Sequence, residues 1–409
     1  MIGLPEIETA RRRIADGILT TPCQPNGPLS ERTGVELWLK LESLQKTGSF
    51  KARGALNTLR SLSAEDRARG VIAASAGNHA QGVAWAASSV GARSVIVMPE
   101  HAPLIKVTRT RELGGEVVLH GQSFDDAFRE AQAICERDGL VFVNAFDDER
   151  VIAGQGSIGL ELLEQLPDLD AVVVPVGGGG LISGIAAAIK ALRPEVAIYG
   201  VQTEAAPAMF RSLAAGEVVV SPLSRSLAEG IAMKVPGRLT FPYVQQLVEK
   251  LVLVSEAEIE WAIFSLLENA KLLSEGAGAA GVAALLAHRL PELAGKKVAV
   301  ILCGGNIDLN FLQKIVERSL VRLSRRCKLH ITVRDQPGAL ATMLGEIGRL
   351  GANVDRIQQN RTFTDATFWE VEVDLTLETK NAAHLEEILA RLAATGYEKV
   401  KVLGPDSVV

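Results

Sequence analysis

Short aliphatic runs alternate with longer segments of helical period along most of the chain. Runs such as Ser94 to Met98 and Ala171 to Val176 are mostly apolar without alternation, which is typical of strands in a parallel sheet covered on both faces. Segments such as Phe124 to Arg137 and Glu258 to Lys271 carry apolar residues three and four positions apart, as amphipathic helices do. Further strands are expected at Val35 to Leu41, Val71 to Ala74, Glu116 to Leu119, Leu140 to Val143, Ala197 to Gln202 and Lys297 to Cys303. The pattern predicts an α/β body.

The pattern changes after an expected helix at Leu309 to Ser324. From Cys327 the expected order is strand, helix, strand, strand, helix, strand, a ferredoxin-like α+β arrangement that suits a separate domain of roughly 80 residues. Its expected elements are Lys328 to Val333, Leu340 to Leu350, Val354 to Gln359, Phe368 to Leu377, Ala383 to Ala394 and Lys399 to Leu403. We therefore expect one domain at residues 1–325 and a second at residues 326–409.

Composition narrows the class of protein. With 409 residues the chain is longer than a typical single domain, so more than one folding unit is expected. Hydrophobic residues make up 47% of the chain and aromatic residues only 4%, which indicates a core packed mainly with aliphatic side chains. A net charge of −5 gives no reason to expect nucleic acid or an anionic membrane as a partner. The four cysteines lie far apart without Cys-x-x-Cys spacing, so neither a disulfide framework nor a zinc site is indicated. The first residues lack a signal-peptide pattern, and we expect a cytoplasmic protein.

Lys51 and a run of four glycines are the strongest candidates for chemistry. The expected strand at 171–176 leads into Gly177, Gly178, Gly179 and Gly180, and a helix is expected from Leu181. Without side chains, the backbone N–H groups of such a run can converge on a phosphate at the positive end of the helix. A lysine amine reacts with carbonyl carbons. Alone, the lysine could be a solvated residue and the glycines a tight turn, but together they suggest a phosphorylated aldehyde cofactor.

Three further clusters follow expected strands, where ligands bind in open α/β sheets. Ser75-Ala-Gly-Asn-His79 offers N–H groups, a hydroxyl and an amide, which could hold a carboxylate or could only cap the next helix. Ser274 to Ala279 indicates a close approach of the backbone. Cys303 could face a ligand, or it could be a buried, inert cysteine.

Six motifs stand in the order found in the threonine/serine dehydratase family. They are Lys40-Leu-Glu-Ser-Leu-Gln-Lys-Thr-Gly-Ser-Phe-Lys-Ala-Arg-Gly54, Ser75-Ala-Gly-Asn-His79, Val151-Ile-Ala-Gly-Gln-Gly156, Gly177 to Leu181, Ser274-Glu-Gly-Ala-Gly278 and Cys303-Gly-Gly-Asn306. The chain resembles this family over almost its whole length, and its last part resembles an ACT domain at Asp335-Gln-Pro-Gly338 and Asn353. The resemblance implies a pyridoxal-phosphate-dependent fold type II body of two parallel-sheet subdomains, the smaller at about residues 50–150, followed by a ferredoxin-like ACT domain.

The resemblance also implies roles for individual residues. Lys51 would bind pyridoxal 5'-phosphate covalently and then remove the α-proton of the substrate. Asn78 would donate to the ring oxygen, and Cys303 would lie opposite the ring nitrogen and, as a weak donor, leave it unprotonated, which favours elimination over transamination. The remaining implied cofactor-binding residues are Phe50, Gly177, Gly178, Gly179, Gly180, Leu181 and Glu275, and the implied substrate-binding residues are Ser75, Gly77 and His79.

The chain departs from the family at several positions. Ala76 stands where serine racemases of the family carry a second serine, so racemisation is disfavoured. Ala228-Glu-Gly230 replaces the familiar Ala-Asp-Gly, and Asn144-Ala-Phe-Asp147 replaces a common His-Pro-Phe-Asp. Some relatives bind a divalent cation through an acid shortly after Glu204, but Phe210 is found there and no metal site is expected.

The resemblance implies elimination of L-threonine to 2-oxobutanoate and ammonium, with serine as a slower substrate. Serine or 3-hydroxyaspartate dehydratase, racemase and β-replacement activities remain alternatives, as does an amino-acid sensor on an inactive scaffold. The ACT domain is expected to bind isoleucine or valine, or else only to hold an oligomer together. Because a ferredoxin-like unit exposes a sheet edge, we expect a homo-oligomer, either a dimer or a tetramer.

Overall fold

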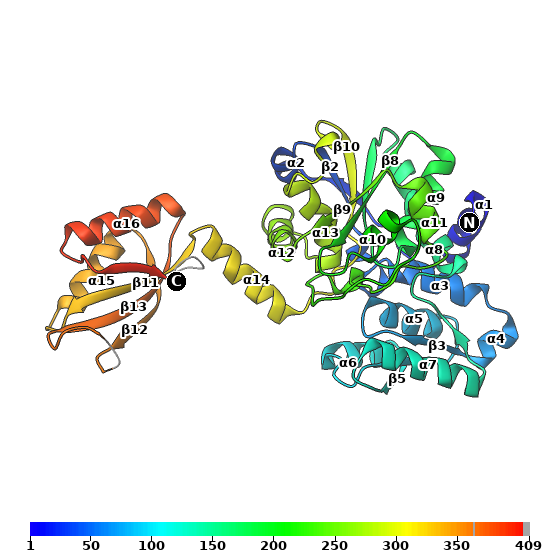
Figure 1. Ribbon diagram of the computed structural model, residues 1–409, viewed down its shortest axis with the longest axis horizontal. Helices are drawn as coiled ribbons and strands as arrows, with labels where there is room; N and C mark the ends of the chain where they lie inside the picture. Colours follow the sequence, from blue (N-terminus) through cyan, green and yellow to red (C-terminus); the bar gives the residue numbers. More distant parts are fainter. Residues whose placement is uncertain (363–364, 404–409) are drawn as a thin grey trace. The chain divides into compact units, whose positions relative to one another are not determined.

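The structure, a computed structural model, describes residues 1–362 and 365–403. The chain divides into two compact units, Met1–Ile307 and Asp308–Val409 (Figure 1). The sequence-based boundary between residues 325 and 326 differs from this division by helix α14 (Leu309–Arg322), which belongs to the second unit. Within the described ranges, no helix combines the length and the apolar character needed to cross a lipid bilayer.

The larger sheet of the first unit has six strands in the order β1-β2-β10-β7-β8-β9. The strands are β1 (Cys23–Pro25), β2 (Glu36–Lys40), β10 (Lys297–Ile301), β7 (Ala171–Pro175), β8 (Ala197–Thr203) and β9 (Lys250–Val254). All neighbours pair in parallel except β1, which is antiparallel to β2. Every residue of β7 is buried, as its uninterrupted apolar run predicts for a central strand.

The smaller sheet has four parallel strands in the order β5-β4-β3-β6. They are β3 (Val71–Ala74), β4 (Ser94–Met98), β5 (Glu116–Leu119) and β6 (Val141–Phe142). Alternate residues of β3 belong to different cores. Val71 packs in a cluster with side chains of α5 (Asn78–Ser89), and Ile72 packs in another with side chains of α7 (Phe124–Asp138). The sheet is therefore covered on both faces.

Helices surround both sheets of the first unit (Figure 1). The remaining ones are α1 (Leu4–Ile14), α2 (Gly27–Thr33), α3 (Lys51–Ser61), α4 (Ala64–Arg69), α6 (Leu104–Glu112), α8 (Glu149–Gln165), α9 (Gly180–Leu192), α10 (Ala208–Ala215), α11 (Phe241–Leu247), α12 (Glu256–Ser265) and α13 (Gly276–Leu286). The helix expected at Glu258 to Lys271 is shorter, because α12 gives way to a π-helical turn at Leu266–Ala270.

The second unit has the strand and helix order expected from the sequence. Its antiparallel sheet runs β12-β13-β11-β14, and its strands and helices are β11 (Arg326–Arg334), α15 (Ala339–Arg349), β12 (Asn353–Asn360), β13 (Glu370–Glu378), α16 (Ala382–Ala394) and β14 (Val400–Leu403). Leu329, Ile331 and Val333 of β11 are buried while their neighbours are not, so one face of this sheet packs on the helices. Phe368 was expected in a strand but lies before β13, with 89% of its surface exposed.

Candidate active site

Lys51 begins α3, directly beside the end of β10. The Phe50 N–H donates to the Cys303 carbonyl oxygen at 3.1 Å, and Ser49 forms an isolated bridge with Gly304. The Lys51 Nζ donates to the Ala145 carbonyl oxygen at 2.6 Å. These contacts bring three distant segments of the chain together around one amine.

The Lys51 amine is buried without a carboxylate partner in the described part of the chain. Burial lowers the pKa of Lys51 to about 8, although Cys303 and Glu275 act in the opposite direction. Among the described residues, no carboxylate lies within ion-pair distance of its Nζ, which instead lies 5.2 Å from the centre of the Phe50 ring. Since only a neutral amine attacks a carbonyl carbon, the lowered pKa increases the fraction of the nucleophilic form near neutral pH.

The glycine run connects β7 to α9 and has a shape that only glycine permits. Gly179 caps α9 with a φ of 99°, and a Cβ on Gly178 would lie 2.3 Å from the Phe146 ring. The Gly178 carbonyl oxygen accepts from the Thr240 hydroxyl at 2.5 Å and from the Gly237 N–H at 3.0 Å. In the described part of the chain, the buried N–H groups of Gly178 and Gly179 have no hydrogen-bond partner. Two such donors at the start of a helix fit a phosphate group.

The segment 144–147 links Lys51 to the glycine run. The Asn144 Oδ1 accepts from the N–H groups of Phe146 at 3.1 Å and Asp147 at 3.0 Å, forming a tight turn. This turn directs the Ala145 carbonyl oxygen to Lys51 and places Phe146 on Gly178. The sequence marked the segment only as a departure from the family. The role of Ala145 had no sequence signal, because it is carried by a backbone atom.

The start of α5 holds Ser75, Gly77, Asn78 and His79 together. Gly77 is the N-cap, and its N–H donates to the Ser75 Oγ at 3.2 Å. The His79 Nε2 lies 2.9 Å from the Val143 carbonyl oxygen and therefore donates to it. Burial and the nearby Lys51 charge lower the pKa of His79 to about 3, so the ring is neutral. With its ring engaged in this way, His79 can serve a substrate carboxylate only through its backbone N–H.

Glu275 and Cys303 complete the site, Glu275 through a hydrogen bond with Asn78 and both through their electrostatic effect on Lys51. The Asn78 Nδ2 donates to the Glu275 Oε1 at 2.7 Å, and burial raises the pKa of Glu275 to about 7. Cys303 is 3% exposed, and burial raises the pKa of its thiol well above the ordinary value, so it stays protonated. Sequence reasoning assigned no role to Asn306, at the end of the Cys303 motif, yet its amide is hydrogen-bonded to Asn78.

Within residues 1–362 and 365–403, no three His, Cys, Asp or Glu side chains are grouped so that they could hold a metal ion. Phe210, the residue found where some relatives have an acid, is 41% exposed. The site thus offers an amine, backbone N–H groups at a helix start, an amide and a thiol.

Both parts of the chain are similar to known proteins. The family described as "Pyridoxal-phosphate dependent enzyme" matches residues 14–304, and "ACT domain" matches residues 329–396. The L-threonine ammonia-lyase of Thermotoga maritima is 50% identical over 404 residues, which are 99% of this chain and 100% of that protein. Threonine deaminase isoform 2 from Solanum lycopersicum, in its processed form, is 39% identical with a TM-score of 0.74, over 77% of this chain and 86% of that one. Maize serine racemase is 34% identical with a TM-score of 0.74, over 78% of this chain and 98% of that one.

Proposed function

This chain belongs to the pyridoxal-phosphate dependent enzyme family and ends in an ACT domain, and we propose that it acts as an L-threonine ammonia-lyase. The reaction removes water across the Cα–Cβ bond of L-threonine, and hydrolysis of the resulting enamine gives 2-oxobutanoate and ammonium. One observation carries the proposal. A lysine amine with a lowered pKa lies within one site with a buried thiol and a glycine run that has free N–H groups. The 50% identity to an L-threonine ammonia-lyase supports the choice of substrate.

The residues of the site fit the family's cofactor. Gly177, Gly178, Gly179 and Gly180, with Leu181 after them, would hold its phosphate, because they lie at the start of α9, where N–H groups that are unpaired in the described part of the chain form the positive end of the helix. Asn78 would donate to the ring oxygen, and Cys303 would face the ring nitrogen. When bound, the cofactor supplies an aldehyde carbon that joins the amino group and a conjugated ring that accepts electron density from the α-carbon.

Lys51 does the proton chemistry in this proposal. With a pKa of about 8, its amine can accept the α-proton near neutral pH and can release it again. The hydrogen bond from Nζ to the Ala145 carbonyl oxygen holds the amine in place between the glycine run and Cys303. The protonated thiol of Cys303 is a weak donor, so it does not supply a proton to the ring nitrogen. This favours prompt loss of the β-hydroxyl over reactions of a long-lived carbanion.

Serine is proposed as a slower substrate, since it differs from threonine by one methyl group, worth about 1–3 kcal/mol in an apolar pocket. Racemisation is a second candidate because maize serine racemase is structurally similar. Ala76 argues against racemisation, because serine racemases of the family carry a second serine hydroxyl at this position, directly after Ser75. The decisive experiment compares kcat/KM for L-threonine, L-serine and 3-hydroxyaspartate and assays D-serine formation. A best substrate that bears a second carboxylate, or racemisation faster than elimination, would overturn the proposal.

The ACT domain is proposed to regulate the enzyme by binding a branched-chain amino acid, isoleucine or valine. In the turn at 335–338, Asp335 is already engaged: its N–H donates to the Trp369 carbonyl oxygen at 2.8 Å and its carboxylate pairs with Arg361 at 3.0 Å. Asn353 donates to Glu378 at 3.1 Å. The Ala339 N–H is engaged as well, because it donates to the Gln336 carbonyl oxygen at 3.2 Å. The donors proposed for an effector carboxylate are therefore the N–H groups of Leu340 and Ala341, in the first turn of α15. The alternative is a domain that only supports a homo-oligomer.

Regulation can be tested with the full-length enzyme and a form truncated after residue 326. Isoleucine or valine should change KM or cooperativity through a coupling free energy of about 1–3 kcal/mol in the full-length enzyme. The truncated form should stay active and unresponsive. A full-length enzyme that ignores isoleucine, valine, leucine and threonine at millimolar concentration would reduce the domain to a structural role.

A further inference from the structure

A chain of side-chain amides crosses the candidate site. The Asn306 Nδ2 donates to the Thr47 carbonyl oxygen and to the Asn78 Oδ1, each at 2.8 Å. The Asn78 Nδ2 in turn donates to the Glu275 Oε1 at 2.7 Å. All three contacts are partly buried. The hydrogen bonds therefore run in one direction, from Asn306 through Asn78 to Glu275.

One backbone carbonyl sets the direction of the whole chain. The Thr47 oxygen can only accept, so the Asn306 atom beside it must be the nitrogen. The second hydrogen of that nitrogen then meets the Asn78 oxygen, which turns the Asn78 nitrogen toward the Glu275 carboxylate. The orientation of the Asn78 amide, which an isolated asparagine would not define, is decided by its partners.

The backbone around Thr47 is shaped to make this contact. Thr47 has a φ of 63°, the left-handed region that β-branched residues rarely adopt, and such outliers concentrate at functional sites. Gly48 follows with a φ of 74°, and a Cβ there would lie 2.6 Å from the Asn306 Oδ1. The Gly305 N–H donates to the Gly48 carbonyl oxygen at 3.0 Å, which holds the two loops together directly before Asn306.

The other end of the chain is equally confined. A Cβ on Gly304 would lie 2.5 Å from the Glu275 Oε1 and 3.1 Å from the Asn78 Nδ2. The Asn306 Oδ1 accepts a weak hydrogen bond from the Arg109 Nη1 at 3.4 Å. Both ends of the Asn306 amide are thus engaged, by Thr47, by Asn78 at the start of α5 and by Arg109 of α6.

We propose that Asn306 is a positioning residue that fixes the Asn78 amide so that Asn78 presents a donor, rather than its oxygen, to the cofactor. One N–H of Asn78 is used by Glu275, and the second is left for the oxygen of the cofactor ring. A reversed Asn78 amide would place its oxygen against the Glu275 carboxylate and would lose both donors. This inference rests on the proposed function only in that the site takes pyridoxal phosphate. It does not depend on which amino acid the enzyme deaminates.

The test is a double-mutant cycle on the full-length protein, with pyridoxal phosphate affinity read from its absorption spectrum and without any substrate. Asn306→Ala and Asn78→Ala should each weaken binding by about fivefold to tenfold, the effect of losing a buried hydrogen bond or its alignment. Because Asn306 acts through Asn78, the double variant should match Asn78→Ala within about twofold. If Asn306→Ala weakens binding equally in both backgrounds, or has no effect, the inference is overturned.

Two further variants separate the positioning role of Asn306 from a general loss of stability. Asn306→Asp keeps the size of the side chain but replaces its two N–H donors by a carboxylate that faces the Thr47 oxygen. It should weaken pyridoxal phosphate binding at least as much as Asn306→Ala, and it provides the test if Asn306→Ala does not fold. Asn269→Ala removes a partly buried amide that donates to the Ser265 carbonyl oxygen at 3.0 Å and is not hydrogen-bonded to Asn306, Asn78 or Glu275 in the described part of the chain. It should leave the affinity unchanged, and an equal loss there would assign the effect to general destabilisation. A wild-type protein that binds no pyridoxal phosphate would instead contradict the proposed function.

Discussion

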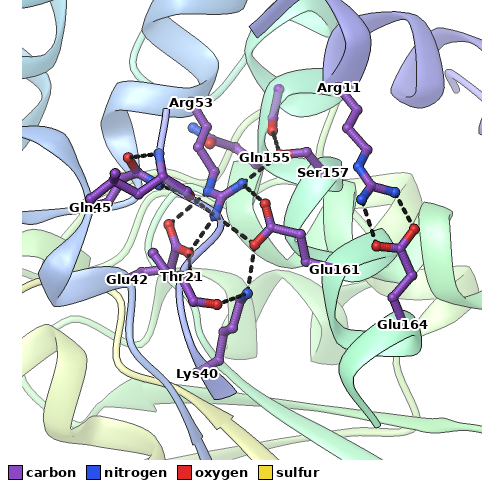
Figure 2. A network of polar contacts seen from close by, with 12 residues as sticks. Arg11, Thr21, Lys40, Glu42, Gln45, Arg53, Gln155, Ser157, Glu161 and Glu164 are labelled. Atoms are coloured by element: carbon purple, nitrogen blue, oxygen red, sulfur yellow. Dashed lines mark hydrogen bonds and ion pairs between the residues drawn. The ribbon is translucent and has the colours of Figure 1, made fainter. Parts of the chain in front are cut away.

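Lys51 and Arg53 lie two residues apart on α3, and the protein treats the two cations in opposite ways. The Arg53 side chain is 0% exposed, and its guanidinium donates to both oxygens of Glu42 and both oxygens of Glu161 (Figure 2). Lys51 has a carbonyl oxygen and an aromatic ring as its neighbours. Burial alone would lower both pKa values, but Glu42 and Glu161 raise the pKa of Arg53, whereas the pKa of Lys51 falls to about 8.

The Arg53 cluster is balanced by a second cation. Lys40 donates to the Glu161 Oε2 at 2.6 Å and to the Thr21 carbonyl oxygen at 2.7 Å, so two cations face two carboxylates (Figure 2). The cluster joins β2, α3 and α8, and it holds the helix that carries Lys51. A paired cation fixes structure, and an unpaired one becomes available for chemistry. The predictions below follow from this difference.

The largest effect is expected from removing the unpaired amine. Lys51→Ala should lower turnover of L-threonine by at least about a thousandfold, because in the proposed function one group is both the covalent anchor and the base. The rate of 2-oxobutanoate formation is the measurement. Lys46→Ala, which changes an exposed lysine five residues earlier, should stay within about twofold of the unchanged enzyme. A residual rate for Lys51→Ala within about tenfold would contradict its role.

Breaking the paired cation should instead cost stability. Arg53→Ala leaves two buried carboxylates short of charge and should lower the free energy of unfolding by about 3–5 kcal/mol. Arg11→Ala is the matched control, since Arg11 pairs with Glu164 at 2.5 Å through two parallel hydrogen bonds but at the surface (Figure 2). It should cost at most about 1 kcal/mol. The measurement is the free energy of unfolding in urea of the unchanged protein and of the two variants. Equal losses of stability in both variants would contradict the difference between the buried and the exposed ion pair.

The reactivity of Lys51 should depend on pH in a window set by its pKa of about 8. Below this value the amine is protonated and does not attack aldehydes, and above it the rate levels off. An ordinary lysine reaches its midpoint only near 10.4. The rate of reductive modification of the cofactor-free protein, followed for the peptide that contains Lys51, should have its midpoint near 8. A midpoint above 10 would mean that burial does not shift this amine.

The smallest effect is expected at Glu275. Its folded pKa of about 7 lies above the reference value of 4.5, so the stability it contributes is present below pH 4.5 and is lost as pH rises toward 7. Glu275→Gln keeps an oxygen for Asn78 but cannot titrate. Between pH 5 and 8, the Tm of the variant should therefore rise relative to the unchanged cofactor-free protein, by about 2–4 °C. Parallel pH profiles for the two proteins would contradict the raised pKa.

Local periodicity was enough for most of the fold. Uninterrupted apolar runs predicted β4 and β7 as strands of buried parallel sheets, and the change of pattern after Ser324 predicted the antiparallel unit. These properties depend on residues two to four positions apart, so they can be seen in one sequence. The glycine run and Lys51 were also found in this way, since a missing side chain and a reactive amine are each properties of a residue type.

The contacts that define the site were decided only by the tertiary structure. Three of these contacts are made by backbone carbonyl oxygens, which every residue type carries. Ala145 binds the Lys51 amine, Val143 accepts from the His79 ring, and Thr47 accepts from the Asn306 amide. Likewise, the opposite pKa shifts of Lys51 and Arg53 have no local signal, because they depend on carboxylates that the fold brings into ion-pair contact with Arg53 and not with Lys51. Sequence determined which groups are present, and tertiary packing decided which of them meet, because burial and pairing are properties of distant segments in contact.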